Sequence, residues 1–316
     1  MAVEDAWSAS VNRRKIIRAM RGWLVASVSI LTIGLGAIAF RYASAPQPQL
    51  IATIVGTRGS VRILPLAGHV SIVAGDVLSA KTRIETGPNG TALLSLGSVG
   101  VRVGPVTELE LERPGRIRLK RGKIYVDSGE TARPDALVVA TEFGNLAHRG
   151  TQYQVQVQPK AYLFTSVREG RILLQDHGAT QSVERGEGLR VAETNEITRS
   201  VIPPYDAQWQ WVSEFVPEFS IEGQSLSVFL DWFARETGRR LVFVGPTSRN
   251  DTDRTTLKGS IGGLTPTQAL NAVVVTTQFQ CDLATDAEVR VNLRPGRPAN
   301  MSRNAASPAV LAGPSR

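Results

Sequence analysis

The sequence predicts a mainly β protein with a single N-terminal transmembrane helix, an all-β sandwich or solenoid-like domain, and a small α+β domain. Three observations predict this order. An uncharged apolar run lies near the start, short alternating runs broken by glycine fill residues 50–201, and helical periodicity appears only after residue 217. Period-two alternation is typical of half-buried strands, whereas apolar residues spaced by three and four are typical of amphipathic helices.

The apolar run from Trp23 to Phe40 contains no charged residue and would span about 27 Å as a helix, close to the thickness of a thin bilayer. Five basic residues precede it against two acidic ones, so the positive-inside rule places the tail of residues 1–22 in the cytoplasm. Trp23 and Phe40 mark the ends of the anchor, where aromatic side chains favour the membrane interface. We therefore expect a single-pass protein of the bacterial inner membrane, with the bulk of the chain in the periplasm.

A cleaved signal peptide is the alternative interpretation of the same run. Ala43-Ser44-Ala45 has the small-residue form of a cleavage site. Three features favour an uncleaved anchor: the apolar run is longer than in a signal peptide, Arg41 lies between the run and the site, and Pro46 would follow the cut directly. The sequence does not decide whether the chain is cleaved after Ala45. Both interpretations place the remainder of the chain outside the cytoplasm.

Residues 50–201 alternate between apolar and polar side chains in many short runs. In "TQYQVQVQ", Tyr153, Val155 and Val157 face one way and glutamines the other, which predicts a half-buried strand with an uncharged polar outer face. Glycines lie between the runs, as turns and bulges require. Many short strands with close glycine spacing indicate a β sandwich or a solenoid-like stack, and not a parallel α/β sheet.

The order of motifs in this region resembles the FecR-type periplasmic signalling domain. The resemblance covers roughly residues 52–192, and the motifs that carry it run from "GDVLSAKTRIETGPNGTALLSL", which begins at Gly75, through "IRLKRGKIYVDS" to "VERGEGLRV". Its most specific part consists of seven residues, which we expect to serve the fold: Val139, Thr141, Gly144, Gly150, Thr151, Tyr153 and Val155. The family usually carries Ala-Leu before the second glycine and Phe at the tyrosine position, whereas this chain has His148-Arg149 and Tyr153.

Residues 202–216 are predicted to be a linker, because Pro203-Pro204 cannot lie in the interior of a sheet. Trp209 and Trp211 alternate beside this proline pair. They either seal a domain junction or, if both are exposed, form an interaction surface.

Residues 217–294 change to a pattern of α plus β. Four apolar residues form one helical stripe that ends at Gly238: Leu226, Phe229, Leu230 and Phe233. Thr265 and Pro266 are suited to begin a second helix. The arrangement resembles the short N-terminal domain of secretins and TonB-dependent transducers, which implies a protein-docking module; a structural cap on the β domain is the alternative. Residues 295–316 lack aromatic and acidic residues, so we expect a disordered tail.

The sequence offers no set of residues for catalysis, so we expect no enzyme, no cofactor, no metal and no small-molecule substrate. The net charge of +8 is spread through the strands, without the joined basic and aromatic residues of a nucleic-acid site. Of the three histidines, His69, His148 and His177, none has a second ligand at metal spacing. Cys281 is the single cysteine, which excludes an internal disulfide and is best interpreted as a small buried residue.

The FecR resemblance implies a transmembrane signal-transducing regulator that acts through protein–protein contacts. In such proteins a TonB-dependent transducer of the outer membrane contacts the periplasmic part, and an extracytoplasmic-function sigma factor is controlled in the cytoplasm. Only 22 residues precede Trp23, whereas a standard interface takes about 20 to 30 residues a side, so sigma-factor control is the weakest part of this expectation. The alternative is an anchored periplasmic scaffold that docks envelope assemblies or cell-wall material.

Overall fold

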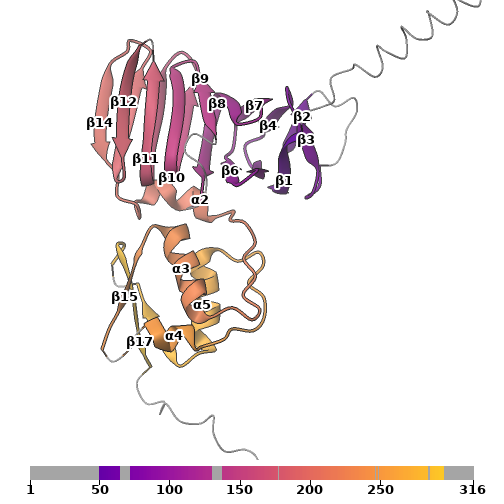
Figure 1. Ribbon diagram of the computed structural model, residues 1–316. Coiled ribbons are helices and arrows are strands. Elements are labelled where there is room, and N and C mark those ends of the chain that lie inside the picture. The colour runs from indigo at the N-terminus through magenta and orange to yellow at the C-terminus, as the bar shows by residue number, and fades with distance from the viewer. Residues whose placement is uncertain are drawn as a thin grey trace, which may run out of the picture. The chain divides into compact units, whose positions relative to one another are not determined.

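The computed structural model describes residues 50–64, 72–129, 137–176, 178–245, 247, 249–283 and 285–294 (Figure 1). The chain divides into two units, Met1–Pro48 and Gln49–Arg316, and all of the described residues belong to the second. Several expectations fall outside the described residues: the tail 1–22, the anchor from Trp23 to Phe40, the cleavage site at Ala45, His69, His177 and the tail 295–316. Within the described ranges, no helix has the length and apolar character needed to cross a membrane.

The protein is mainly β, as the sequence predicts, and fourteen strands form one continuous hydrogen-bonded sheet. In chain order these strands are β1 (Leu50–Arg58), β2 (Val61–Leu64), β3 (Val77–Ser79), β4 (Arg83–Thr86), β5 (Thr91–Leu96), β6 (Val99–Val103), β7 (Glu108–Arg113), β8 (Arg116–Asp127), β9 (Val138–Thr141), β10 (Gly144–Gln158), β11 (Tyr162–Asp176), β12 (Ala179–Glu184), β13 (Glu187–Ala192) and β14 (Ile197–Val201). Within this sheet β8 and β9 pair in parallel, and the other described pairs are antiparallel.

The sheet folds into two layers because the long strands β8, β10 and β11 change partners along their length. For example, residues 144–147 of β10 pair with β9, whereas residues 152–157 pair with β8. A glycine with a left-handed φ lies between the two halves of each long strand: Gly122 (φ 88°), Gly150 (φ 59°) and Gly170 (φ 74°). Any other residue would be strained there, so glycine allows the strand to bend from one layer into the other.

The pairings give the first layer the order β3-β1-β5-β6-β8-β10-β11-β13-β14 and the second the order β2-β4-β7-β8-β9-β10-β11-β12. One apolar core lies between the layers. Tyr153, Val155 and Val157 point into this core and are buried, so the alternation in the sequence correctly marks the inner face of β10.

A small α+β region follows the linker (Figure 1). Its elements, with the short helices of the linker, are η1 (Ala207–Trp209), α2 (Gln210–Ser213), α3 (Leu226–Thr237), β15 (Arg240–Phe243), α4 (Arg249–Asp253), α5 (Pro266–Val275), β16 (Phe279–Asp282) and β17 (Glu288–Leu293). β15 and β16 flank β17, in parallel and antiparallel pairing respectively. The predicted helix ends are observed: Gly238 adopts a left-handed conformation after α3, and Thr265 caps α5 with Pro266 in its first turn. A second core, separate from that of the β domain, joins α3, α5 and this sheet.

Candidate functional site

The outer face of the first layer carries polar side chains that are nevertheless buried. Arg102, Tyr125, Gln154 and Ser166 lie next to one another on β6, β8, β10 and β11. All four are at most 6 % exposed. The outer face of an antiparallel sheet is ordinarily solvated. Here the linker and the C-terminal end of α3 cover it.

A buried ion pair lies at the centre of this junction. Nη2 of Arg102 donates to both carboxylate oxygens of Glu236, at 2.9 and 2.8 Å, and Nη1 donates to the carbonyl oxygen of Val212 at 2.7 Å. The two side chains are only 7 % and 8 % exposed. Burial alone would lower the pKa of Arg102, but the adjacent Glu236 carboxylate outweighs it and raises that pKa. Separating the pair without hydration would therefore leave an uncompensated buried charge on Arg102.

A second arginine, Arg168, is held by backbone carbonyls and aromatic rings. Its Nε donates to the carbonyl oxygen of Pro204 at 2.8 Å, and its Nη1 donates to the carbonyl oxygen of Glu236 at 3.0 Å. The guanidinium lies 4.9 Å from the ring centroid of Trp209. Burial lowers the pKa of Arg168. This arginine joins the β domain to both the linker and the last turn of α3.

The tryptophan pair of the linker seals the junction. Trp209 is 1 % exposed, its indole N–H donates to the carbonyl oxygen of Pro203 at 3.0 Å, and its ring meets Tyr125 edge-on with 6.1 Å between centroids. Trp211 is half-buried and its indole N–H donates to Oε1 of Gln154 at 3.1 Å. The interpretation of the pair as an exposed interaction surface is therefore wrong for Trp209, because Tyr125 and the linker enclose it.

The glutamine face of β10 is also covered. Gln152 and Gln154 are 1 % and 6 % exposed, so the prediction of a half-buried strand is wrong at these positions. The physical reason is the linker: the side-chain amide of Gln154 donates to Oε1 of Gln208 at 2.9 Å. Nε2 of Gln152 instead donates to Asp127 at 2.9 Å.

The rim of the junction is closed by Arg235 of α3. Its Nη2 lies 2.5 Å from Oδ1 of Asp127, and its Nη1 lies 3.0 Å from Oε2 of Glu169. Burial alone would raise the pKa of Asp127, but the Arg235 guanidinium and the hydrogen bonds donated by the Gly129 N–H and Gln152 together outweigh it and hold that pKa below its usual value. The linker can approach the end of α3 closely only because residue 238 is glycine. A Cβ at this position would lie 2.0 Å from the carbonyl oxygen of Pro204.

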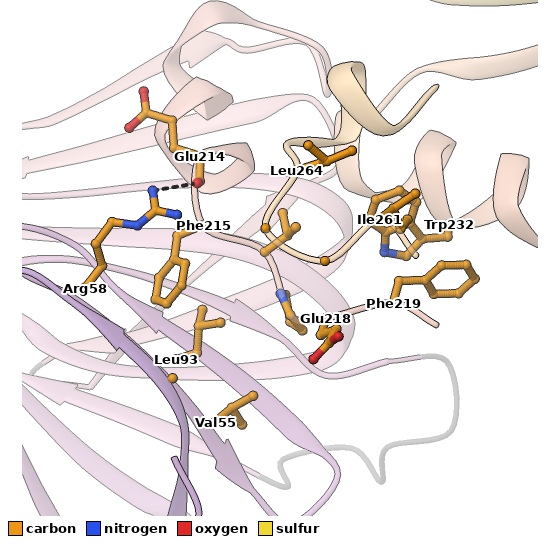
Figure 2. Close-up of a pocket in the computed structure, with 15 residues that line it drawn as sticks. Val55, Arg58, Leu93, Glu214, Phe215, Glu218, Phe219, Trp232, Ile261 and Leu264 are labelled. Atoms are coloured by element: carbon orange, nitrogen blue, oxygen red, sulfur yellow. Dashed lines mark hydrogen bonds between the residues drawn. The ribbon is translucent and has the colours of Figure 1, made fainter. Parts of the chain in front are cut away.

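A groove of about 380 Å³ opens beside this junction (Figure 2). Figure 2 shows Val55 and Leu93 of the β domain on one side and Phe219 and Trp232 on the other. The rings of Phe219 and Trp232 stack with 5.0 Å between centroids. Glu218 lies on the rim and is exposed. We name this hollow the aromatic groove. Arg58, Glu214 and Glu218 line it beside the apolar side chains, so its lining combines aromatic rings with both signs of charge, which suits contact with a polypeptide.

The seven residues of the predicted family motif serve the fold of the β domain. Val139, Tyr153 and Val155 belong to its core. Thr141 donates from Oγ1 to the carbonyl oxygen of Gly144 at 2.9 Å and so holds the turn between β9 and β10. Gly150 forms the bend of β10, and the Thr151 N–H donates to Oγ of Ser128 at 2.7 Å. The motif therefore marks the hairpin and the bend that position the junction face.

The other candidate residues lie within the fold. His148 is buried in the β domain, and its Nε2 accepts a hydrogen bond from the Leu137 N–H at 3.2 Å. Cys281 is half-buried in β16, and burial raises the pKa of its thiol to about 12. In the part of the chain that the structure describes, no group of three or more His, Cys, Asp or Glu side chains is placed to hold a metal ion.

Comparison with known proteins identifies the β domain. Residues 82–173 match the model of the family described as "FecR protein", a range that runs from just before β4 into β11 and contains all seven motif residues. Two crystal structures described as a "putative anti-sigma factor" from Parabacteroides distasonis are similar to the chain at 14 % identity and a TM-score of 0.36. They cover 67 % and 66 % of this chain, and the chain covers 98 % and 97 % of theirs. At that score the likeness supports no argument about fold or function. No curated protein matches the chain.

Proposed function

Since the protein is of the FecR type, with its FecR domain within the β region, we propose that it is a membrane-anchored signal-transducing regulator that acts through protein–protein contacts. The match of residues 82–173 to the FecR family is the observation that carries this proposal. In this proposal the run from Trp23 to Phe40 anchors the chain in the bacterial inner membrane, and the β domain and the α+β region lie in the periplasm. A TonB-dependent transducer contacts the periplasmic part, and an extracytoplasmic-function sigma factor is controlled through the cytoplasmic tail.

The signal in this proposal is a shift between two arrangements of the junction, without a covalent step. One arrangement is the closed junction, in which Arg102 and Glu236 are paired; in the other the pair is separated and hydrated. A partner that binds one arrangement more tightly increases its population. The buried pair supports a two-state response, because an ion pair that is only half separated loses its Coulomb attraction before water can compensate.

The α+β region is the docking module in this proposal, by its resemblance to the short N-terminal domain of secretins and TonB-dependent transducers. Two helices, α3 and α5, and a three-stranded sheet are consistent with that resemblance. Contact of α3 with Arg102 and Arg168 gives such a module a direct connection to the FecR domain.

The experiment that tests the regulator is cross-linking of the full-length tagged protein in cells, followed by purification from membranes and identification of bound proteins. We expect a sigma factor among them, and a transcription reporter for that factor should change when the gene is deleted. The N-terminal residue of the purified protein is determined in the same preparation. A soluble product that begins at Pro46 would lack the tail of residues 1–22 and would contradict the proposal.

The aromatic groove favours a second candidate function, an anchored periplasmic scaffold that binds envelope proteins or cell-wall material without sigma-factor control. Its exposed Glu218 and the stacked pair of Phe219 and Trp232 are suited to contact with another molecule. Cross-linking to envelope proteins alone, together with an unchanged reporter, would support the scaffold over the regulator.

A further inference from the structure

A second groove, of about 630 Å³, follows the line where α3 meets the β domain. We name it the arginine groove. Four arginines and two carboxylates line it: Arg168, Arg185, Arg235, Arg239, Glu169 and Asp231. Arg168 and Arg185 belong to the β domain, whereas Arg235 and Arg239 belong to the end of α3 and the residues after it.

Both carboxylates of this groove already have partners. Glu169 lies 3.0 Å from Arg235, and Asp231 pairs with Arg249, which is outside the lining of the groove. Arg235 is in turn occupied by Asp127 and Glu169. The acidic residues of the groove therefore do not neutralise its other arginines.

The remaining arginines carry charge that is only partly compensated. Nη2 of Arg239 lies 3.6 Å from Asp286, whose side chain is 84 % exposed. Nη1 of Arg239 is buried and, among the described residues, has no hydrogen-bond partner. Arg168 is held by carbonyl oxygens, and Arg185 is exposed. A guanidinium donates in parallel to the two oxygens of a carboxylate, so this groove is suited to receive acidic side chains.

We propose that the arginine groove binds an acidic segment of a partner protein. The lining has both signs of charge, because Glu169 and Asp231 lie among the arginines. A segment with spaced carboxylates can place them opposite Arg185 and Arg239, whereas a uniformly charged polyanion would also pass Glu169 and Asp231, whose arginine partners are already occupied, and would gain no contact there. The mixed lining therefore favours a polypeptide over a polyanionic polymer.

The arginine groove is complete only while the junction is closed, because each module contributes two of its arginines. An occupant consequently binds the closed arrangement and increases its population. This inference goes beyond the proposed function by giving the chemistry of one partner. Binding of an acidic segment does not require a sigma factor, so the arginine-groove proposal and the regulator proposal can be contradicted independently.

The test measures fluorescence anisotropy of a labelled peptide of alternating Glu and Gly residues with the full-length protein in neutral detergent. A peptide of alternating Gln and Gly is the uncharged comparison. We expect the Glu peptide alone to bind, with an affinity that falls as salt increases. The double substitution Arg185→Ala with Arg239→Ala should weaken binding about tenfold, as expected for the loss of two charge contacts, one from the exposed Arg185 and one from the partly buried Arg239.

The matched control is Arg254→Ala with Lys258→Ala, which removes the same net charge from exposed positions of the α+β region outside the groove. It should bind the Glu peptide like the unaltered protein. Equal losses in the two double variants would show attraction by net charge alone and would overturn the proposal. Binding of the Gln peptide at the same affinity would also overturn it.

A charge reversal keeps the proposal testable if the double variant folds poorly. Arg185 is exposed, so Arg185→Glu should leave the fold intact, weaken binding of the Glu peptide and permit binding of a Lys-Gly peptide. Inorganic polyphosphate is added as a competitor. If it bound more tightly than the Glu peptide and lost affinity in the same arginine variants, the groove would be a polyanion site and the assignment to an acidic polypeptide would be wrong.

Discussion

The two outer faces of the FecR-type β domain carry similar charged residues but differ in what covers them. On the second layer, ion pairs stay in contact with solvent: Glu112 pairs with Arg116 and Arg118 there, and all three side chains are at least 20 % exposed. On the first layer, Arg102 pairs with Glu236 of the covering helix α3, and both side chains are below 10 % exposed. The free energy lost when an ion-pair partner is removed therefore depends on whether water can take the place of that partner.

The largest expected effect is on the covered face. Replacing Glu236 by Ala leaves Arg102 charged and buried, so the free energy of unfolding should fall by about 3 to 5 kcal/mol. Urea unfolding of the full-length protein, followed by tryptophan fluorescence, measures this loss because Trp209 and Trp211 lie at the junction.

The double substitution Arg102→Met with Glu236→Leu is the control for this prediction. It removes both charges and keeps an apolar contact, so it should recover most of the loss caused by Glu236→Ala. If Glu236→Ala alone lowered the free energy of unfolding by less than about 1 kcal/mol, the covered pair would behave like a solvated one, and burial would not account for the difference between the two faces.

The sequence predicted the inside of the β domain well and its covered outer face poorly. Alternation in "TQYQVQVQ" correctly placed Tyr153, Val155 and Val157 inside, because period two depends only on the local strand. It could not show what covers the opposite face. Arg102 and Glu236 are 134 residues apart, and each is an ordinary polar position of its own strand or helix. The pair of Trp209 and Trp211 was the only feature of the sequence that pointed to the junction, because two large aromatic side chains in a linker are expected to pack against another part of the protein.

A second prediction concerns the close approach of the linker to the end of α3. Gly238→Ala should lower the free energy of unfolding by about 2 to 3 kcal/mol, because a left-handed φ of 68° disfavours a Cβ and the carbonyl oxygen of Pro204 would lie within 2.0 Å of it. Gly223 is a matched control: its φ is 78°, and its Cβ would meet nothing within 4 Å. Gly223→Ala should therefore cost only about 1 kcal/mol in thermal unfolding. If Gly238→Ala and Gly223→Ala lowered the free energy of unfolding equally, the linker would be able to move away from residue 238 without loss of stability.

A third prediction uses the rim of the covered face. Burial alone would raise the pKa of Asp127, but the Arg235 guanidinium, helped by hydrogen bonds from the Gly129 N–H and Gln152, holds that pKa below its usual value in the folded protein. A lowered pKa contributes stability above the unfolded pKa of about 3.9, and this contribution is lost as the pH falls through the folded pKa. Between about pH 5 and pH 2 the unaltered protein should therefore lose about 1 kcal/mol more than Asp127→Asn. Parallel stability–pH curves for the two proteins would mean that the rim pair does not hold the junction.

The smallest effect is expected on the solvated face. Burial alone would raise the pKa of Glu112, but its hydrogen bonds to Arg116 and Arg118 outweigh it and lower that pKa. Because water can hydrate these arginines when the carboxylate is removed, Glu112→Gln should cost less than about 1 kcal/mol. High salt should reduce the difference further, because it screens exposed pairs more than buried ones. Urea unfolding at low and high salt measures both quantities. A loss for Glu112→Gln as large as that for Glu236→Ala, and unaffected by salt, would mean that ion pairs of the two faces contribute alike and that cover by the linker and α3 does not set their strength.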